Sequence, residues 1–272
     1  MKVTVIIQAR MASTRLPEKV MKEVLGKPLL SYLIERIRCC KGVKDIILAT
    51  TLNPEDDSIA TLGRNEGVKV FKGSENNVLE RFHEAATMFG AMHIMRITAD
   101  CPFIDPDFLY MLIKYYFAEN PDYTNNCTCP TLPDGLDAEI FNFETLDYAY
   151  KHALLPSELE HVTPYIQSHP EFFKILNWTH HDDLSHLRWT VDELEDFEFV
   201  RQVIESIYPG NNNFRTKDIL DLLYQRPELV KINADFTRNE GYLPSLEVDK
   251  KLFDSGNHTF ASRNFAARKA ED

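Results

Sequence analysis

Several common functional signatures are missing from this chain of 272 residues. Glycine is scarce, with 10 residues, and the chain has neither the Gly-x-x-x-x-Gly-Lys-Ser/Thr pattern of a Walker A loop nor the Gly-x-Gly-x-x-Gly pattern of a dinucleotide fold. Positive charge is also in deficit, because 30 Lys and Arg stand against 42 Asp and Glu. The net charge of -12 argues against a general nucleic-acid binder, although a local basic site is compatible with it.

Long apolar runs are absent too. No run reaches the roughly 18 apolar residues of a membrane-spanning helix, and no basic-then-apolar leader precedes the first expected strand. The five cysteines form neither a disulfide framework nor a zinc-ligand pattern, which is typical of reduced thiols. We therefore expect a cytoplasmic protein that does not bind membranes.

The first half of the chain, residues 1–121, alternates between strand-like and helix-like segments. With 44% hydrophobic and 26% charged residues, the chain is large enough for a sizeable core. This order implies a mostly parallel sheet that helices cover on both faces. We expect strands at residues 3–7, 45–50, 68–71 and 93–98, and helices at 29–37, 54–65, 78–89 and 106–118.

The second half, residues 122–235, predicts a mixed extension of the same sheet. We expect strands at residues 122–126, 137–141, 172–178 and 187–191, and helices at 143–153, 158–168, 194–206 and 216–224. Beyond this half the pattern becomes polar and less periodic, so residues 236–272 are predicted to be a C-terminal extension. Its last part, residues 261–272, is expected to be a loose end or a short peripheral helix.

A basic loop follows the first expected strand. Arg10, Arg15 and Lys19 lie there together with the small residues Ala9 and Ser13. Ligands of open α/β sheets bind beyond the carboxyl ends of the strands, and three cations at this place suit the charge of a polyphosphate. The alternative from the residues alone is an ordinary solvated basic loop.

The motif of this loop, residues 8–19 (QARMASTRLPEK), resembles the signature of cytidylyltransferases that activate acidic sugars. It is most similar to the spore coat polysaccharide synthesis protein F branch of a family that includes the CMP-Kdo and CMP-acylneuraminate synthetases. The resemblance covers residues 2–235, and more loosely residues 238–250, and it implies a three-layer α/β/α nucleotidyltransferase fold of Rossmann-like type. It also implies CTP as the donor, Mg²⁺ or alternatively Mn²⁺ as the cofactor, and a homodimer. The family often has glycine where this chain has Ala12 and Glu18, and Glu18 adds an anion beside the expected triphosphate site.

Asp100 follows the fourth expected strand and so lies at the same sheet edge as the basic loop. A carboxylate there can hold Mg²⁺ that is shared with substrate phosphates, although a turn before Cys-Pro also favours Asp. The resemblance of residues 96–102 and 184–192 to family motifs implies metal binding by Asp100 and by Asp192. From the residues alone Asp192 is a helix N-cap, as is Asp105 before Pro106.

A second loop, residues 73–81, has small residues that permit the close approach of a nucleotide. From the residues alone, Asn77 or its neighbour is an ordinary helix cap. The loop resembles the nucleotide-contacting loop of the family. The resemblance as a whole implies that the nucleotide is bound by Gln8, Ala9, Arg10, Ser13, Arg15, Lys19, Ser74, Asn77, Arg81 and Thr98, and that Arg10, Lys19 and Asp100 are the catalytic residues.

The acceptor is expected to bind in the second half. Two carboxylates there alternate along an expected strand and face one side of it, where solvated edge carboxylates are the alternative. A lone histidine on a helix is often structural, whereas arginine suits a planar anion. The resemblance implies that the acceptor is bound by Asp137, Glu139, His161, His186 and Arg188. The HHDD segment at residues 180–183 is predicted to be a polar loop, because consecutive residues of an extended segment point to opposite faces.

These features together predict a CTP-dependent cytidylyltransferase. It transfers CMP to an acidic sugar or a similar anionic acceptor, with release of pyrophosphate, in surface polysaccharide or glycoconjugate biosynthesis. Two alternatives remain open. One is the same chemistry with a phosphonate acceptor or another nucleotide donor, and the other is a non-catalytic nucleotide-binding relative.

Overall fold

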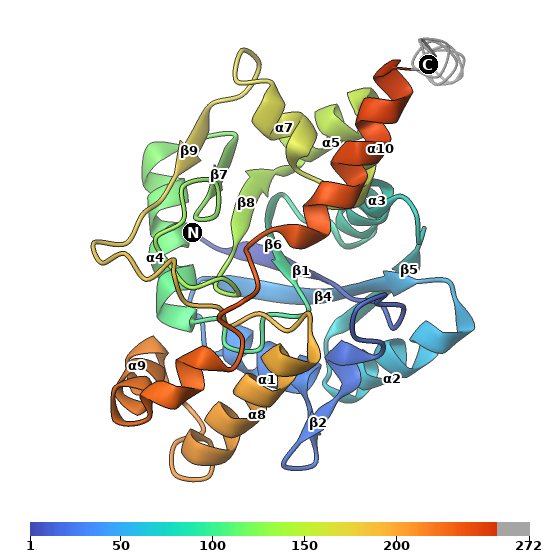
Figure 1. Cartoon of the computed structure of the whole chain (residues 1–272). Helices are drawn as coiled ribbons and strands as arrows, with labels where there is room; N and C mark the ends of the chain where they lie inside the picture. The colour runs from blue at the N-terminus through green and yellow to red at the C-terminus, as the bar shows by residue number, and fades with distance from the viewer. Residues whose placement is uncertain (255–272) are drawn as a thin grey trace.

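The computed structural model describes residues 1–254, and a seven-stranded sheet runs through its centre (Figure 1). The strands lie in the order β5-β4-β1-β6-β8-β7-β9. Only β8 runs antiparallel to its neighbours, so the mostly parallel mixed sheet that the sequence predicts is confirmed. The strands are β1 (Val3–Gln8), β4 (Val43–Thr51), β5 (Lys69–Gly73), β6 (His93–Thr98), β7 (Tyr123–Asn125), β8 (Glu139–Asn142) and β9 (Ile175–Asn177).

Helices cover both faces of this sheet. Val5 and Ile7 of β1 pack into one core and Ile6 into the other, because successive side chains of a strand point to opposite faces. The first face is covered by α1 (Leu29–Arg38), α2 (Asp57–Asn65) and α4 (Pro106–Glu119). The second is covered by α3 (Val78–Phe89), α5 (Phe143–His152), α6 (Pro156–His161) and α7 (Pro164–Ser168). The expected three-layer α/β/α architecture is therefore confirmed.

A third apolar cluster lies beside the sheet, around the fully buried Trp189 and Phe103. It fastens the segment that leads to Asp192 against the body of the molecule. Other members come from β2 (Glu23–Val24), which pairs with β3 (Lys27–Pro28), from the start of α1, from α8 (Leu194–Ile207) and α9 (Thr216–Gln225), and from the short helix η3 (Pro227–Lys231).

Two expected elements of the second half are wrong. Residues 187–191 do not join the sheet, because their backbone pairs with the single residue Asp134, whose N–H and C=O bond Leu187 and Trp189. The helix expected at residues 158–168 is two helices, α6 and α7, because Val162 between them has a positive φ of 73°.

Of the two helix starts near the site, one uses the expected carboxylate and the other does not. Asp105 caps α4 as predicted, since it accepts a hydrogen bond from the N–H of Asp107 at 2.9 Å. Asp192 does not cap α8. Asp196 does so instead, by accepting the N–H groups of Asp192 and Glu193 at 2.9 and 3.0 Å. The side chain of Asp192 is thereby free for other contacts.

Beyond residue 235 the chain continues as a short helix, η4 (Glu240–Tyr242), and as α10 (Leu243–Asp254), which packs on α6. The segment before α10 crosses from the α9 side of the molecule to the α6 side (Figure 1). The loose end expected at residues 261–272 lies outside the described residues. Within residues 1–254, no helix has the length and apolar character needed to cross a membrane.

Candidate functional site

The basic loop after β1 folds back on itself and returns to the sheet edge. The N–H of Met11 bonds Asp56 at 2.6 Å, and the N–H of Glu18 bonds the carbonyl of Met11 at 3.0 Å. This closure requires a left-handed backbone at Glu18, with φ 57° and ψ 18°. The loop ends in η1 (Lys19–Met21), whose first residue points back to the end of the sheet.

Lys19 joins the two acidic residues that the sequence predicts as metal ligands. Its Nζ lies 2.7 Å from Asp100 Oδ2 and 2.7 Å from Asp192 Oδ1. Asp192 reaches this point because the N–H of Val191 bonds the carbonyl of Asp100 at 2.9 Å. Residues far apart in the sequence therefore meet at the carboxyl end of β6.

The charges at this centre are fixed by their mutual proximity. Burial favours the neutral form of Asp100, yet the ammonium of Lys19 and a hydrogen bond from Thr98 lower the pKa of Asp100 to about 2. Burial likewise opposes the charge of Lys19, but the two carboxylates raise its pKa above the ordinary value. Both groups are ionised at neutral pH.

The donor set fits a divalent cation. Asp100 and Asp192 present carboxylate oxygens to one point, at the edge of the sheet where the basic loop also ends. Mg²⁺ prefers oxygen ligands and is commonly held by one or two carboxylates that it shares with substrate phosphates. Lys19 supplies the positive charge between these carboxylates in the structure.

The arginines of the basic loop are also paired with carboxylates. Arg15 lies 3.0 Å from Asp192, 3.2 Å from Glu193 and 3.8 Å from Glu240. Arg10 is more exposed and lies 3.9 Å from Glu160 of α6. A polyphosphate that bound here would take over these cations from protein carboxylates.

The second predicted nucleotide loop is held by its own polar side chains. Ser74 accepts the N–H of Asn77 at 3.1 Å, and Asn77 caps α3 by accepting the N–H of Glu80 at 2.9 Å. Arg81 is 2% exposed, and its Nε has no hydrogen-bond partner among the described residues. Burial, and next the charge of Arg10, lower the pKa of Arg81 to about 10. A buried guanidinium beside another arginine is suited to an anionic ligand.

Gln8 and Glu139 together orient an arginine that the sequence analysis did not assign. Arg96 of β6 donates to Gln8 Oε1 at 3.0 Å and forms an ion pair with Glu139. Glu139 is 3% exposed, so the solvated alternative for this residue is wrong. It also accepts the hydroxyls of Tyr123 and Thr163, both at 2.6 Å. Its direct contact with an acceptor remains a prediction.

Three further members of the predicted nucleotide set lie at the strand ends. The N–H of Ala9 continues the β1 ladder to the carbonyl of Ala49 at 3.1 Å. Ser13 Oγ accepts the N–H of Leu16 at 3.4 Å and so helps to shape the basic loop. Thr98 Oγ1 lies 3.2 Å from Cys101 Sγ, beside Asp100.

Arg188 is the hub of the second half of the site. It forms a bidentate pair with Asp196, at 2.9 Å for both contacts, and lies 2.9 Å from Asp134 and 3.4 Å from Asp192. Burial alone would lower the pKa of Arg188, but Asp196 and Asp134 raise it. The side chain of Arg188 is 7% exposed. Through its ion pairs it connects the segment of Asp192 to the loop around Asp134.

Asp137 lies beside this hub and is paired with an unexpected partner. Arg238 from the C-terminal extension forms an ion pair with Asp137 and donates to the carbonyl of Leu132 at 3.2 Å. Burial nevertheless raises the pKa of Asp137 to about 7, against the opposing effect of Arg238.

The two predicted acceptor histidines lie in different surroundings. His161 Nε2 lies 3.1 Å from Ser245 Oγ, and the ring of Tyr242 contacts it edge-on. Burial, and next the charge of Arg96, lower the pKa of His161, although the nearby carboxylate of Glu160 opposes this shift. His186 is exposed and lines a small hollow with Phe236.

The polar segment at residues 180–183 departs from the expected geometry. The ligand atoms of His180, His181 and Asp182 all lie within 4.8 Å of one another. The prediction that they point apart is wrong, because the segment bends and does not extend. The N–H of Asp182 bonds His180 Nδ1 at 3.2 Å, and His181 pairs with Asp182 at 2.9 Å.

The residues that line or orient this site and that the sequence analysis missed include Arg96 and three residues of the C-terminal extension, Arg238, Glu240 and Ser245. Arg96 lies four residues before Asp100 in the same motif, at the end of β6. This spacing in the sequence could have identified Arg96 as a site residue. The other three lie in the C-terminal extension, where no periodic pattern marks them.

Comparison with known proteins agrees with this geometry. The family model described as Cytidylyltransferase matches residues 4–219. An uncharacterised protein of Methanocaldococcus jannaschii is 34% identical over 244 residues, which cover 89% of this chain and 98% of the relative. The spore coat polysaccharide biosynthesis protein of Bacillus subtilis is 32% identical over 230 residues, which cover 82% and 94%.

A solved structure is similar over nearly the same length. The cytidylyltransferase from Leptospira borgpetersenii superposes with a TM-score of 0.81 at 30% identity, over 87% of this chain and 98% of that chain. The nucleotidyltransferase fold of Rossmann-like type, expected from the motif of the basic loop, is thereby confirmed. The chain belongs to the cytidylyltransferase family and is a nucleotidyltransferase.

Proposed function

We propose that this enzyme transfers CMP from CTP to an anionic acceptor, an acidic sugar in the first place, and releases pyrophosphate. The observation that carries the proposal is the contact of Lys19 with Asp100 and Asp192 at 2.7 Å each. It brings the end of the basic loop to a pair of carboxylates at the carboxyl edge of the parallel strands, where ligands of open α/β sheets bind.

The donor would bind through the cations described above. Arg10, Arg15 and Lys19 would exchange carboxylate partners for the phosphates of CTP, and the unpartnered Nε of Arg81 would face the same anion. A divalent cation held by Asp100 and Asp192 would neutralise phosphate oxygens. The chain's own cations then stabilise the charge that develops on the leaving pyrophosphate.

The chemical step is an in-line displacement at the α-phosphorus. A bond forms between the acceptor oxygen and the α-phosphorus while the bond to the β-phosphate oxygen breaks, and the proton of the acceptor hydroxyl passes to solvent. No covalent intermediate with the protein is needed, because positioning and charge neutralisation supply most of the rate in such reactions. Lys19 and Arg15 face the leaving group in this arrangement.

The acceptor would bind on the side of Arg188 and His161. An anionic acceptor is favoured because Arg96 is held in place by Gln8 and Glu139 on that side of the sheet and influences His161 electrostatically. The relative from Bacillus subtilis is described as a polysaccharide biosynthesis protein, which supports a sugar acid as the acceptor. The expected cytoplasmic location and homodimer are parts of the same proposal, and light scattering on the purified protein tests the dimer.

The donor is tested by thermal unfolding with CTP, UTP, ATP and GTP, each with and without Mg²⁺. At about 100 times its dissociation constant, a ligand stabilises by about 2.7 kcal/mol. For a chain of this size that corresponds to a rise in Tm of about 5–10 °C. We expect this rise only when CTP and Mg²⁺ are added together, and not with the other three nucleotides. An equal rise with another nucleotide would reject CTP selectivity.

The reaction is tested by pyrophosphate release with CTP and 3-deoxy-manno-octulosonate, N-acetylneuraminate or a phosphonate. We expect release with a sugar acid, and its loss in Asp100→Asn at a temperature where circular dichroism shows that this variant is folded. The exposed Asp221, which pairs with Lys217 on α9, provides the matched control Asp221→Asn. Wild-type turnover in Asp100→Asn would reject the role of this carboxylate.

A further inference from the structure

The C-terminal extension contributes a segment, residues 237–245, that contacts both halves of the site. We call it the C-terminal strap. It follows Phe236, includes η4 and ends in the first turn of α10 (Figure 1). Its residues contact the acceptor side through Arg238 and the basic loop through Glu240.

The start of the strap is fastened to the acceptor side. Arg238 is 15% exposed, pairs with Asp137 and donates to the carbonyl of Leu132 at 3.2 Å. Arg188 donates to the carbonyl of Thr237 at 3.3 Å. These contacts place the strap directly beside the hub of the second half of the site.

The middle of the strap faces the basic loop. Glu240 Oε1 accepts the N–H and the hydroxyl of Thr237, at 2.9 and 2.8 Å, and thereby fixes the turn that begins η4. Its other oxygen, Oε2, lies 3.8 Å from Arg15. The two oxygens of one carboxylate therefore have separate tasks, one within the strap and one toward the basic loop.

The end of the strap reaches the second arginine of the basic loop indirectly. Ser245 donates to Glu160 Oε2 at 2.7 Å, and Glu160 Oε1 lies 3.9 Å from Arg10. Arg10 and Arg15, the two arginines proposed to bind the triphosphate, are thus both connected to carboxylates that the strap holds or supplies.

Few apolar contacts hold the end of the strap, in contrast to its start, which the ion pair of Arg238 fastens. The inner face of α10 buries Ser245 and Asp249, while Leu243, Leu246 and Val248 are 59%, 40% and 45% exposed. Opening it therefore exposes little additional apolar surface, which is the property of segments that open locally.

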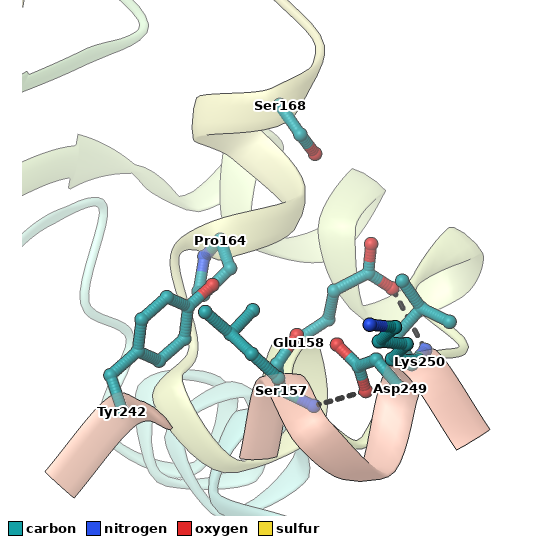
Figure 2. A pocket seen from close by; sticks show the side chains of 9 residues that line it. Ser157, Glu158, Pro164, Ser168, Tyr242, Asp249 and Lys250 are labelled. Atoms are coloured by element: carbon teal, nitrogen blue, oxygen red, sulfur yellow. Dashed lines mark hydrogen bonds between the residues drawn. The ribbon is translucent and has the colours of Figure 1, made fainter. Parts of the chain in front are cut away.

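A cavity of about 390 Å³ adds to this freedom. It lies between α10 and the helices α6 and α7, and Figure 2 shows Tyr242, Ser157 and Asp249 at its border. Polar contacts cross it from Ser157, whose N–H donates to Asp249 at 3.2 Å and whose side chain bonds Tyr242.

We propose that the C-terminal strap is a gate of the nucleotide site and that Glu240 is its positioning residue. In the nucleotide-free enzyme Glu240 pairs with Arg15, beside the closer Asp192 and Glu193, and the triphosphate takes Arg15 in exchange, which releases the strap from the basic loop. This inference rests on the proposed function, because it takes the phosphates of CTP as the competitor of Glu240.

The exchange is favourable on electrostatic grounds. Arg15 and Glu240 are 31% and 34% exposed and 3.8 Å apart, so their pairing is of the weak, solvent-screened kind. A triphosphate offers several charged oxygens to the same guanidinium and can bind it in the bidentate manner that arginine favours.

The test uses Glu240→Gln in the full chain. Gln retains an oxygen that can accept from Thr237, so the strap keeps its turn while the ion pair with Arg15 is lost. The control is Glu247→Gln, an exposed residue of α10. By calorimetry we expect CTP with Mg²⁺ to bind Glu240→Gln about two- to fivefold more tightly than wild type, the range for a partly exposed ion pair. We expect no change in Glu247→Gln.

Hydrogen exchange separates a gate from a mere change in charge. In wild type, CTP should accelerate amide exchange in residues 237–245, and in Glu240→Gln this segment should already exchange faster without CTP. If CTP binds wild type but the exchange of residues 237–245 responds neither to CTP nor to Glu240→Gln, the gate is rejected whatever the affinity of the variant, while the proposed function stands. If wild type binds no CTP, the proposed function and the gate are both rejected.

Discussion

Glu18 offers a direct test of the conformation of the basic loop. Its φ of 57° and ψ of 18° lie in the left-handed region, which costs a residue with a side chain about 1–2 kcal/mol. Glycine adopts this region freely, but it loses about 0.5–1 kcal/mol through the greater entropy of the unfolded chain. Glu18→Gly should therefore stabilise the protein by about 0.5–1 kcal/mol, the difference between these two effects.

The assay is thermal unfolding followed by circular dichroism. For a domain of this size the expected gain corresponds to a rise in Tm of about 1–4 °C. Glu18→Gln is the matched control, because it removes the charge and keeps the strained backbone, so its Tm should equal that of wild type. A Tm for Glu18→Gly at or below that of Glu18→Gln would refute the argument from strain.

The same pair of variants separates backbone strain from electrostatics at the nucleotide site. Both remove the carboxylate that lies in the basic loop next to Lys19. If the charge of Glu18 opposes the triphosphate, both variants should bind CTP more tightly by the same factor. A tighter binding in Glu18→Gly alone would instead point to the flexibility of the loop.

Three further predictions follow from single contacts. Lys19→Ala should lose at least about 2 kcal/mol of transition-state stabilisation, about 30-fold in kcat/KM, whereas the exposed Lys231→Ala should lose none. A loss within twofold would remove Lys19 from the mechanism. Gly135→Ala should lower Tm by at least about 4 °C, because φ is +103° and the new Cβ would lie 2.5 Å from a backbone nitrogen. Gly210→Ala should not, because its new Cβ would lie 3.9 Å from the nearest atom, an ordinary contact. Asp196 has a lowered pKa in the folded state: burial raises it, but the hydrogen bonds of its arginine partner outweigh this. The stabilisation that ionised Asp196 gives to the folded protein is therefore complete above the unfolded pKa of about 4, and it is lost as the pH falls through the lower pKa of the folded state. The Tm advantage of wild type over Asp196→Asn should shrink between pH 7 and pH 3, and an advantage independent of pH would contradict the assigned ion pair.

The sequence predicts well the elements whose buried residues are apolar and whose ends are fixed by residues close to them in the chain. Residues 3–7 of β1 and 46–50 of β4 are buried at every position, and β6 has apolar residues on both sides of Arg96, as expected for parallel strands covered on both faces. The starts of α3 and α4 follow from Asn77 and Asp105, whose side chains cap the helix within three residues of their own position.

The elements that it misses depend on distant partners. Residues 187–191 have the apolar character of a strand, but their burial comes from packing of Trp189 beside Phe103 and α8. α10 is hidden from a search for apolar periodicity because its buried positions are Ser245 and Asp249.

The site itself was predicted in part. The motif resemblance indicated Lys19, Asp100 and Asp192, and the structure brings these three together. The resemblance did not indicate that Asp196 accepts the N–H groups at the start of α8, which leaves the side chain of Asp192 available for other contacts. That exchange depends on Arg188 and on Asn233, which donates to Asp196 at 2.8 Å.

The reversed direction of β8 has a consequence for enzyme engineering. Because Glu139 at its start pairs with Arg96 of β6, the loop that enters β8 arrives at the same edge from which β1 and β6 depart. A designer can therefore vary the exposed positions of this incoming loop, residues 127–137 except Leu132, Asp134, Gly135 and Leu136, without altering β1 or β6. Under the proposed function, the acceptor side could then be changed in libraries while the strands on the donor side stay the same.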